Sequence, residues 1–344
     1  MVWHSGFTTE AEAKAFRDER RVKLRRGRVA RKDKITVGDY LDMWLPAHAA
    51  TKDLKASTVN SYTEKIKCHL KPRLGGTRLQ NLTHEQIQRM YMDMLDEGLS
   101  RRSVEYVGTV LRLALKHAVT QYQFLDQNPA ENIPIPRPRK AVTQTWTSDE
   151  IRKILTTVQE DRYGPLFYLQ ALTGARRGEL LGLRWKDVDL KKGVVTFRVN
   201  RVRLNGGYVE TTLKNDRPKQ VPVDDMTMSM LAAHKKRQAA DKLKSRKWLD
   251  EDYVFCNRNG GPLNPSNMHR AWKELIQQAG VPYQKPHALR HTHATLLLEA
   301  GEQLHVVAER LGHRDAMVTA TIYAHVTAEQ SRGAADTFQK LLAD

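Results

Sequence analysis

The sequence predicts a mainly α-helical protein of the α+β class, with a small antiparallel β-sheet. Three observations lead to this prediction. Amphipathic helical patterns with capping residues fill the first part of the chain. Short β-branched or alternating runs occur between residues 193 and 223, and helical patterns return from residue 226 onward. A length of 344 residues allows two domains, or three.

The composition favours a polyanionic partner. Lys and Arg number 57 against 39 Asp and Glu, a formal net charge of +18, which points first to nucleic acid, although a basic enzyme without such a partner would show the same balance. No apolar run approaches the roughly 18 residues of a membrane span, and the N-terminus lacks the apolar stretch of a signal peptide. The two distant cysteines, Cys68 and Cys256, exclude a disulfide scaffold and fit a reducing cytoplasm.

Residues 1–34 are strongly basic, with eleven Lys and Arg against five Asp and Glu. Residues 8–28 have the pattern of a helix with a Thr cap at its start and Gly27 as a stop. Ala13 and Phe16 give this helix a thin apolar face, so it is not expected to fold alone. It is either a solvated basic helix or an arm that contacts DNA.

Residues 35–133 have the pattern of an all-helical unit. The four predicted helices occupy residues 36–49, 55–70, 83–98 and 101–121. Ser57 or Thr58 is expected to cap the second helix, and Thr83 with Gln86 is expected to form a capping box for the third. The fourth helix repeats its apolar residues with a period of about 3.6 residues, which is typical of a helix with one buried face.

A Pro-rich, basic segment at residues 134–144 follows the helical unit. Its three prolines forbid a helix and favour an extended chain, so we expect a linker between domains. The next domain, residues 145–344, begins with Thr147 and Glu150 as another capping box.

The β-structure is expected in the middle of this second domain. Three short strands are predicted within residues 193–204, 206–213 and 219–223, with Asn205 and Gly206 as a hairpin turn. The helices that follow are interrupted by a loop rich in Asn, Gly and Pro.

The stretch TGARRGELLGL holds the first candidate functional residues. Gly174 lets the chain turn sharply between two helices, so that Arg176 lies at the N-terminus of the second helix. The helix dipole disfavours a cation there, whereas Arg176 and the helix end together would attract an anion. Glu179 is well placed to orient the Arg176 guanidinium. The alternative is an Arg–Glu pair on the surface.

The stretch HALRHTH supplies a second set of candidates. His287 and Arg290 are three residues apart and can face one ligand from a single helical turn. His287 and His291 are four residues apart, a spacing that also occurs in metal sites. Because no HExxH-type carboxylate is present and the segment is rich in cations, we expect no metal here.

For each of three further polar residues there are two alternative explanations, one structural and one chemical. Lys214 precedes a turn, where it is either solvated or a mobile ammonium that can donate a proton. His313 follows Gly312 at the end of a helix, where it is either a cap or a catalytic residue. Tyr323 lies between small residues in TATIYAHV, where it either packs or reacts.

Taken together, these residues have the chemistry of a phosphate site. Two Arg, a Lys and two His in one domain of a basic protein suit a phosphate, because the guanidinium fork matches two phosphate oxygens. A Tyr is then the available nucleophile, and neither a metal nor another cofactor is needed.

At this point the sequence resembles the tyrosine recombinase (phage integrase) family. The residues that carry the resemblance are, in order, Arg176, Lys214, His287, Arg290, His313 and Tyr323. They lie in the stretches TGARRGELLGL, TLKNDRPKQVPV, HALRHTHATLLLEAG, LGH and TIYAHV, which span about 150 residues. Residues 35–133 resemble the family's helical core-binding (SAM-like) domain, and residues 145–344 its catalytic domain. Residues 5–28 resemble only the last helix of an arm-binding domain, whose preceding strands are missing.

The resemblance implies a reaction. Tyr323 would attack a DNA phosphodiester, giving a 3′-phosphotyrosyl link and a free 5′-hydroxyl. Lys214 would protonate the leaving 5′-oxygen, and His287 would be the acid or base, or the hydrogen-bond partner, of Tyr323. A 5′-hydroxyl of a new strand would then reverse the step and join exchanged partners.

The resemblance also implies how charge is offset. Arg176 and Arg290 would clamp the non-bridging oxygens of the phosphate, and His313 would donate a hydrogen bond to it. Glu179 would support Arg176 without contacting the DNA.

The resemblance further implies partners and place. The two domains would close round duplex DNA at specific sites as a C-shaped clamp, and a final helix in residues 327–342 would dock on a neighbouring subunit in a tetramer on two duplexes. A DNA-bending protein, an excision factor and a bacterial cytoplasmic location follow by analogy, with no membrane. The implied function is site-specific recombination for a mobile element. The alternatives are a type IB topoisomerase-like enzyme, a catalytically inactive DNA-binding protein and a metallohydrolase built on the His cluster.

Overall fold

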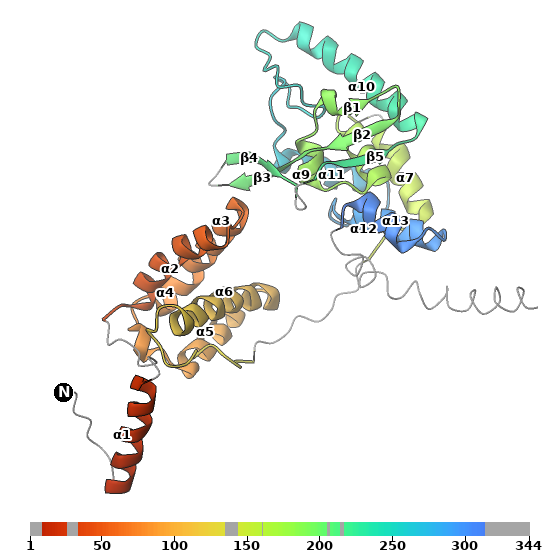
Figure 1. Ribbon diagram of the computed structural model, residues 1–344. Helices are drawn as coiled ribbons and strands as arrows, with labels where there is room; N and C mark the ends of the chain where they lie inside the picture. Colours follow the sequence, from red (N-terminus) through yellow and green to blue (C-terminus); the bar gives the residue numbers. More distant parts are fainter. Residues whose placement is uncertain are drawn as a thin grey trace, which may run out of the picture. The chain divides into compact units, whose positions relative to one another are not determined.

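The structure is a computed structural model of the chain (Figure 1). It describes residues 9–25, 34–134, 144–159, 161–204, 207–213 and 217–313, with only the backbone of 19–25. The chain divides into two compact units, Met1–Lys140 and Ala141–Asp344, and each has its own hydrophobic core. Mostly helical units with small antiparallel sheets confirm the predicted α+β class.

The first helix, α1 (Glu10–Arg25), confirms the helix predicted in the basic N-terminal region. Thr9 caps it, since its hydroxyl accepts a hydrogen bond from the backbone N–H of Glu12 at 3.2 Å. The stop predicted at Gly27 lies outside the described residues.

The remaining helices of unit 1 follow in four segments, as predicted. They are α2 (Val37–Thr51), a continuous run of α3 (Ala56–Lys65), a π-helical turn (Ile66–Leu70) and α4 (Lys71–Leu74), then α5 (His84–Asp96) and α6 (Arg101–Thr120). A short 3₁₀ turn, Leu79–Asn81, precedes α5.

Of the two helix caps predicted within residues 35–133, one is confirmed and one is wrong. Thr83 and Gln86 exchange side-chain to backbone hydrogen bonds at the start of α5. The cap predicted at Ser57 or Thr58 is wrong, because Lys55 is the N-cap of α3 and no side chain caps it. The first turn is instead closed on the Lys55 carbonyl, which accepts from the Thr58 N–H at 2.8 Å.

The core of unit 1 is built around the aromatic face of α2. Trp44 and Tyr40 are fully buried against α6, where the Tyr40 hydroxyl donates to the carbonyl of Ala114 and the Trp44 indole donates to His117. These two hydrogen bonds satisfy the Tyr40 hydroxyl and the Trp44 indole N–H, so that both large rings fill the core without leaving a buried polar group unpaired.

In the sequence of unit 2, three helices precede the described strands and four follow them. Its helices are α7 (Ser148–Val158), α8 (Gly164–Thr173), α9 (Arg177–Leu181), α10 (Asp225–Lys244), α11 (Pro265–Gln278), α12 (Ala288–Glu299) and α13 (Leu304–Leu311), with a 3₁₀ turn at Trp185–Asp187. The capping box of Thr147 and Glu150 at the start of α7 is confirmed. Helix α8 is buried on nearly every face, and α12 packs against it. Helix α12 also packs against α13 (Figure 1).

The strands form two sheets, which differs from the prediction of three strands. Strands β1 (Val188–Asp189), β2 (Val194–Phe197) and β5 (Lys219–Pro222) make one antiparallel sheet, and β3 (Val199–Leu204) pairs with β4 (Gly207–Thr212) in the other. The single run predicted at 193–204 is divided at Arg198, whose side chain turns to Asp187 at 2.7 Å. Leu204 pairs with Gly207, and the two residues predicted as the turn between them lie outside the described residues.

None of the helices that the structure describes has the length and apolar character needed to cross a membrane.

Two methionines of α5 offer a matched test of the unit 1 core. Met94 is fully buried, whereas Met92, two residues away, is 50% exposed. We expect Met94→Ala to lower the free energy of unfolding by about 2–5 kcal/mol, because it leaves a cavity. Met92→Ala should change it by less than about 0.5 kcal/mol. Calorimetric unfolding of the full chain measures both, and equal shifts would contradict this assignment of the core.

Candidate active site

The turn between α8 and α9 brings the first candidate residues into position. Gly174 ends α8 with a φ of +60°, a conformation that glycine adopts without strain. A Cβ atom at this position would lie 2.4 Å from Leu311 Cδ2, so a side chain would also collide with α13. The turn leaves Arg176 as the N-cap of α9, as predicted.

Arg176 and Glu179 form a pair that is largely withdrawn from water. Arg176 Nη1 lies 2.8 Å from Glu179 Oε1, and the backbone N–H of Arg176 donates to Glu179 Oε2 at 3.0 Å. The Glu179 side chain is 2% exposed and that of Arg176 is 30% exposed. The alternative of a surface pair therefore does not hold, and the carboxylate fixes Arg176 through both its side chain and its backbone.

A second cation, Lys219, reaches the same carboxylate. Its Nζ lies 2.9 Å from Glu179 Oε2, and its side chain is 8% exposed. It also lies over the ring of Phe197, with 4.7 Å between Nζ and the ring centroid. Sequence reasoning missed this residue. The available indication was its position in β5, two residues before Val221 and on the same inward face.

Arg290, in the first turn of α12, is buried and held by two backbone carbonyls. Its guanidinium donates to the carbonyl of Gly174 at 2.7 Å and to that of Leu311 at 2.8 Å. These oxygens lie at the C-terminal ends of α8 and α13, where the helix leaves carbonyls unpaired and favours a cation. Arg290 thus links α8, α12 and α13. Arg176 lies next to this junction, because its Nη2 donates to the carbonyl of Gly312 at the end of α13.

Arg310, which the sequence analysis did not single out, also links several elements through backbone carbonyls. From α13 it donates to the carbonyls of Leu172 and Pro222 and to the ring nitrogen Nε2 of His293. The pKa of His293 is lowered to about 4, first by burial and then by the charge of Arg310. His293 is therefore a neutral packing residue, which separates it from the other histidines of its stretch.

His287 lies at the N-cap of α12 beside His291, with 4.9 Å between the ring centroids. The pKa of His287 is lowered to about 4, chiefly by burial and then by His291, Arg290 and Arg176. A base among so many cations stays neutral at pH 7. Within the described residues, no group of three or more His, Cys, Asp or Glu is arranged to hold a metal ion.

His313 follows Gly312, which ends α13 with a φ of +67°. The pKa of His313 is lowered to about 4, first by burial and then by the charges of Arg290 and Arg176, with smaller effects of His291 and Lys219. The same cations act on His313 and on His287, so both imidazoles belong to one site. The carbonyl of Gly312 also accepts from Arg176 Nη2 at 3.5 Å.

The structure therefore brings five of the seven predicted residues together: Arg176, Glu179, His287, Arg290 and His313. The other two, Lys214 and Tyr323, lie outside the described residues. We call Arg176, Lys219, Arg290 and Glu179 the cationic cluster. The pKa of Lys219 is lowered to about 8, first by burial, against the opposing effect of Glu179, and also by the charges of Arg290 and Arg176, so all three cations lie within electrostatic range. With neutral histidines, the cluster carries two net positive charges, which suits an anion.

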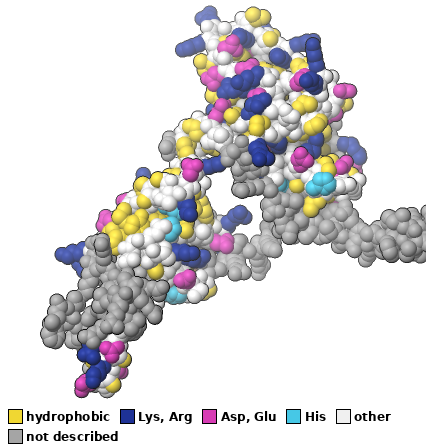
Figure 2. All heavy atoms as spheres, in the orientation of Figure 1, with side chains coloured by type: hydrophobic (Ala, Val, Ile, Leu, Met, Phe, Trp, Pro, Cys, Tyr) yellow, Lys and Arg dark blue, Asp and Glu magenta, His cyan; other side chains and the backbone are white. Residues whose placement is uncertain are grey.

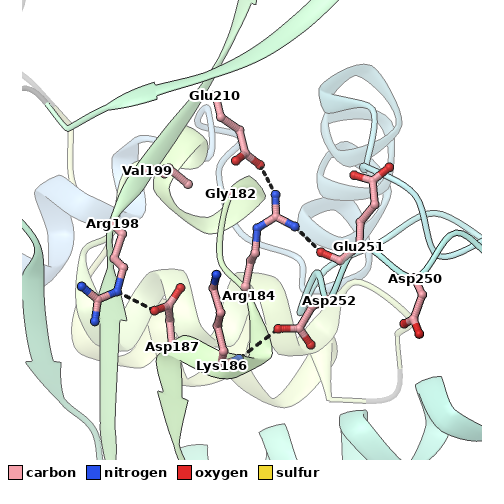
Figure 3. Close-up of a pocket in the computed structure, with 10 residues that line it drawn as sticks. All are labelled: Gly182, Arg184, Lys186, Asp187, Arg198, Val199, Glu210, Asp250, Glu251 and Asp252. Atoms are coloured by element: carbon pink, nitrogen blue, oxygen red, sulfur yellow. Dashed lines mark hydrogen bonds and ion pairs between the residues drawn. The ribbon is translucent and has the colours of Figure 1, made fainter.

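A pocket of about 480 Å³ elsewhere in unit 2 has the opposite charge (Figure 3). Arg184 points to Glu210 at 2.8 Å and Arg198 to Asp187 at 2.7 Å. Its lining residues include five Asp or Glu and three Lys or Arg, so negative charge prevails. It would repel a phosphodiester, unlike the cationic cluster. On the visible face of the molecule, Lys and Arg are spread among acidic residues (Figure 2).

Two family models match the chain. The model described as "Phage integrase family" matches residues 144–330, and the model described as "Phage integrase, N-terminal SAM-like domain" matches residues 36–95. The first of these alone spans more than half of the chain.

Curated relatives extend over most of the chain. It is 32% identical to a XerC-like tyrosine recombinase of Caldanaerobacter subterraneus subsp. tengcongensis, over 97% of this chain and 90% of the relative. It is 27% identical to the ICEBs1 integrase of Bacillus subtilis, over 80% of this chain and 76% of the relative.

Solved structures share the fold. The Tn1549 transposon integrase in complex with transposon right end DNA matches with a TM-score of 0.75 at 20% identity, over 88% of this chain and 99% of that chain. A lambda integrase tetramer bound to a Holliday junction matches with a TM-score of 0.61 at 18% identity, over 93% and 88%.

The neutral histidines predict an acid sensitivity. The pKa values of His287, His293 and His313 fall from 6.5 to about 4 in the folded chain. The unfolded chain therefore binds more protons between these values, and the free energy of unfolding should decrease as the pH falls from 6.5 toward 4. Urea unfolding at several pH values measures the slope, and ¹⁵N NMR of the imidazoles gives the three titrations. Midpoints near 6.5 for these rings would contradict the described site.

Proposed function

This chain belongs to the phage integrase family and is a tyrosine recombinase, and we propose that it is the site-specific integrase of a mobile element, acting on duplex DNA. The resemblance found in the sequence agrees with the family match over residues 144–330. The observation that carries the proposal is the cationic cluster, which three separate segments of unit 2 assemble: Arg176 and Lys219 bind one buried carboxylate, and Arg290 binds the carbonyl of Gly174 in the preceding turn.

The cluster has the charge that phosphoryl transfer needs. A phosphodiester carries one negative charge, and a further charge develops as the pentacoordinate state forms. Two net positive charges therefore match the transition state better than the bound ester, which is how a site accelerates the reaction. Arg176 and Arg290 are the proposed clamp on the non-bridging oxygens, with His313 as a further hydrogen-bond donor.

Tyr323 is the proposed nucleophile. Its oxygen attacks phosphorus, the bond to the 5′-oxygen breaks, and a 3′-phosphotyrosyl ester remains. The phenol proton has to leave, since the usual pKa of Tyr is about 10. His287 is the proposed acceptor. Its pKa of about 4 in the DNA-free chain makes it a weak base, but the negative charge of a bound phosphate raises the pKa of a nearby imidazole. We therefore expect His287 to act as a base only once DNA is present.

Lys214 is the proposed acid that protonates the leaving 5′-oxygen. The reaction exchanges one phosphate ester for another, so the bond energy is kept for rejoining and no ATP is consumed. The chain's own cations supply the charge stabilisation that a metal ion provides in other phosphoryl-transfer enzymes.

The wider arrangement is part of the same proposal. The two units would close on DNA as a C-shaped clamp, with specific attachment or core sites as partners. A tetramer on two duplexes, joined by the C-terminal residues 327–342, would exchange the strands. The reaction would take place in the bacterial cytoplasm, and a DNA-bending protein and an excision factor would set its direction.

Covalent capture tests the nucleophile. We expect the protein to form an adduct with members of a pool of nicked duplexes of randomised sequence, because the nick lets the 5′-hydroxyl fragment diffuse away. Tyr323→Phe should abolish the adduct, and sequencing of the captured DNA identifies the target site. Adduct formation by the Phe variant would refute the assignment. DNA binding without any adduct in the wild type would favour an inactive DNA-binding protein.

The leaving group tests Lys214. On the captured sequence, Lys214→Ala should slow cleavage by about 10²–10⁴-fold, because a general acid is lost. A 5′-thio leaving group needs no proton, so the same variant should cleave it at nearly the wild-type rate. Single-turnover gel assays compare the two substrates, and equal damage on both would exclude the general-acid role.

A further inference from the structure

We propose that Lys219 is a positioning residue for cleavage: it neutralises Glu179, so that the charge of Arg176 is left to act on the scissile phosphate. This inference rests on the proposed function, and it concerns a residue outside the set that the sequence resemblance supplied.

The contacts of Glu179 are divided between the two cations. Oε1 accepts from the Arg176 guanidinium at 2.8 Å, while Oε2 accepts from the Arg176 backbone at 3.0 Å and from Lys219 Nζ at 2.9 Å. The carboxylate is 2% exposed, so protein groups and not water must compensate its charge. Glu179, Arg176 and Lys219 together therefore carry one net positive charge.

Lys219 is packed on several sides in this place. It is the first residue of β5 and is paired across the sheet with Phe197, whose ring lies beneath its ammonium. Its methylene groups fill the space beside Gly312, where an added Cβ would lie 3.0 Å from Lys219 Cδ. The lysine therefore contacts both Glu179 and the turn that presents His313.

The ionisation states agree with this arrangement. Burial alone would raise the pKa of Glu179, but Lys219 first and Arg176 second bring it below its usual value. The pKa of Lys219 is lowered to about 8 by burial, against the opposing effect of Glu179, so the amine is mainly protonated at pH 7. Without Lys219, Glu179 and Arg176 would cancel each other, and the cluster would keep only the charge of Arg290.

The alternative is that Lys219 is itself the acid for the leaving group. Its ammonium is 8% exposed and is bound to Glu179, so proton loss would leave a buried carboxylate with one partner fewer. This makes Lys219 a residue that acts through Glu179 and Arg176, and the experiment below separates the two roles.

The test is a double-variant cycle in single-turnover cleavage of the nicked duplex that covalent capture identifies. Lys219→Met should slow cleavage by about 10- to 100-fold, less than the loss of a donor that touches the oxyanion. Lys219→Arg should restore most of the rate, because it keeps the charge. In a Glu179→Gln background there is no carboxylate to neutralise, and Lys219→Met should cause no further slowing. That double variant also restores the two net charges of the wild-type cluster.

Lys242→Met is the matched control. Lys242 pairs with Asp250 at 2.7 Å at the surface of α10, where its side chain is 47% exposed. Its removal changes the net charge equally and should leave the cleavage rate within about twofold. Circular dichroism checks the fold of each variant. The double variant buries no unpaired charge, and in Glu179→Gln the amide oxygen can still accept from Lys219 Nζ, so these two rates can be compared even where Lys219→Met alone does not fold.

Each outcome is decisive. If Lys219→Met slows Glu179→Gln as much as it slows the wild type, the role through Glu179 is refuted while the proposed function stands. If a 5′-thio leaving group rescues Lys219→Met selectively, Lys219 is the acid and not a positioning residue. Equal slowing of both leaving groups, with no slowing in the Gln background, supports the proposal. A wild type that forms no adduct would overturn the inference and the proposed function together.

Discussion

A carboxylate that is removed from water keeps its charge only where cations reach it, and Glu179 meets this condition twice. Arg176 comes from the end of the α8–α9 turn and Lys219 from the start of β5, so one ion cluster joins the helical part of unit 2 to its sheet. The turn itself exists because Gly174 takes a positive φ against α13. Loss of the carboxylate would therefore remove the link between β5, the start of α9 and the Arg176 guanidinium.

The second support of the site is the use of helix C-termini. Arg290 and Arg310 both donate to carbonyls at or near the end of α8, and Arg290 also reaches the end of α13. Backbone dipoles at the helix ends thus balance part of their charges. Arg290 thereby fixes the ends of α8 and α13 relative to α12. His313 owes its position to the same junction, because it follows the Gly312 turn that this network holds.

The sequence sufficed where a feature is local. The Gly174 turn, the Arg176 N-cap and two capping boxes depend on residues within one or two turns, and the structure contains them all. Lys219 was not predictable in this way, since its partner Glu179 lies 40 residues earlier and a strand lysine normally points to water. The division of a β-run at Arg198 also depended on a distant group, Asp187, and on which strand each half pairs with.

The permanence of these charges suits a reaction that must run in both directions. Arginines stay protonated at any physiological pH, and the neighbouring histidines are held neutral chiefly by burial and further by these cations, so the charge of the proposed clamp does not depend on a proton that moves during catalysis. Cleavage and rejoining pass through the same pentacoordinate state, and fixed cations lower it equally from either side. Proton transfers are then left to the groups proposed at the two reacting oxygens, of which His287 begins the same helix, α12, that carries Arg290 of the proposed clamp.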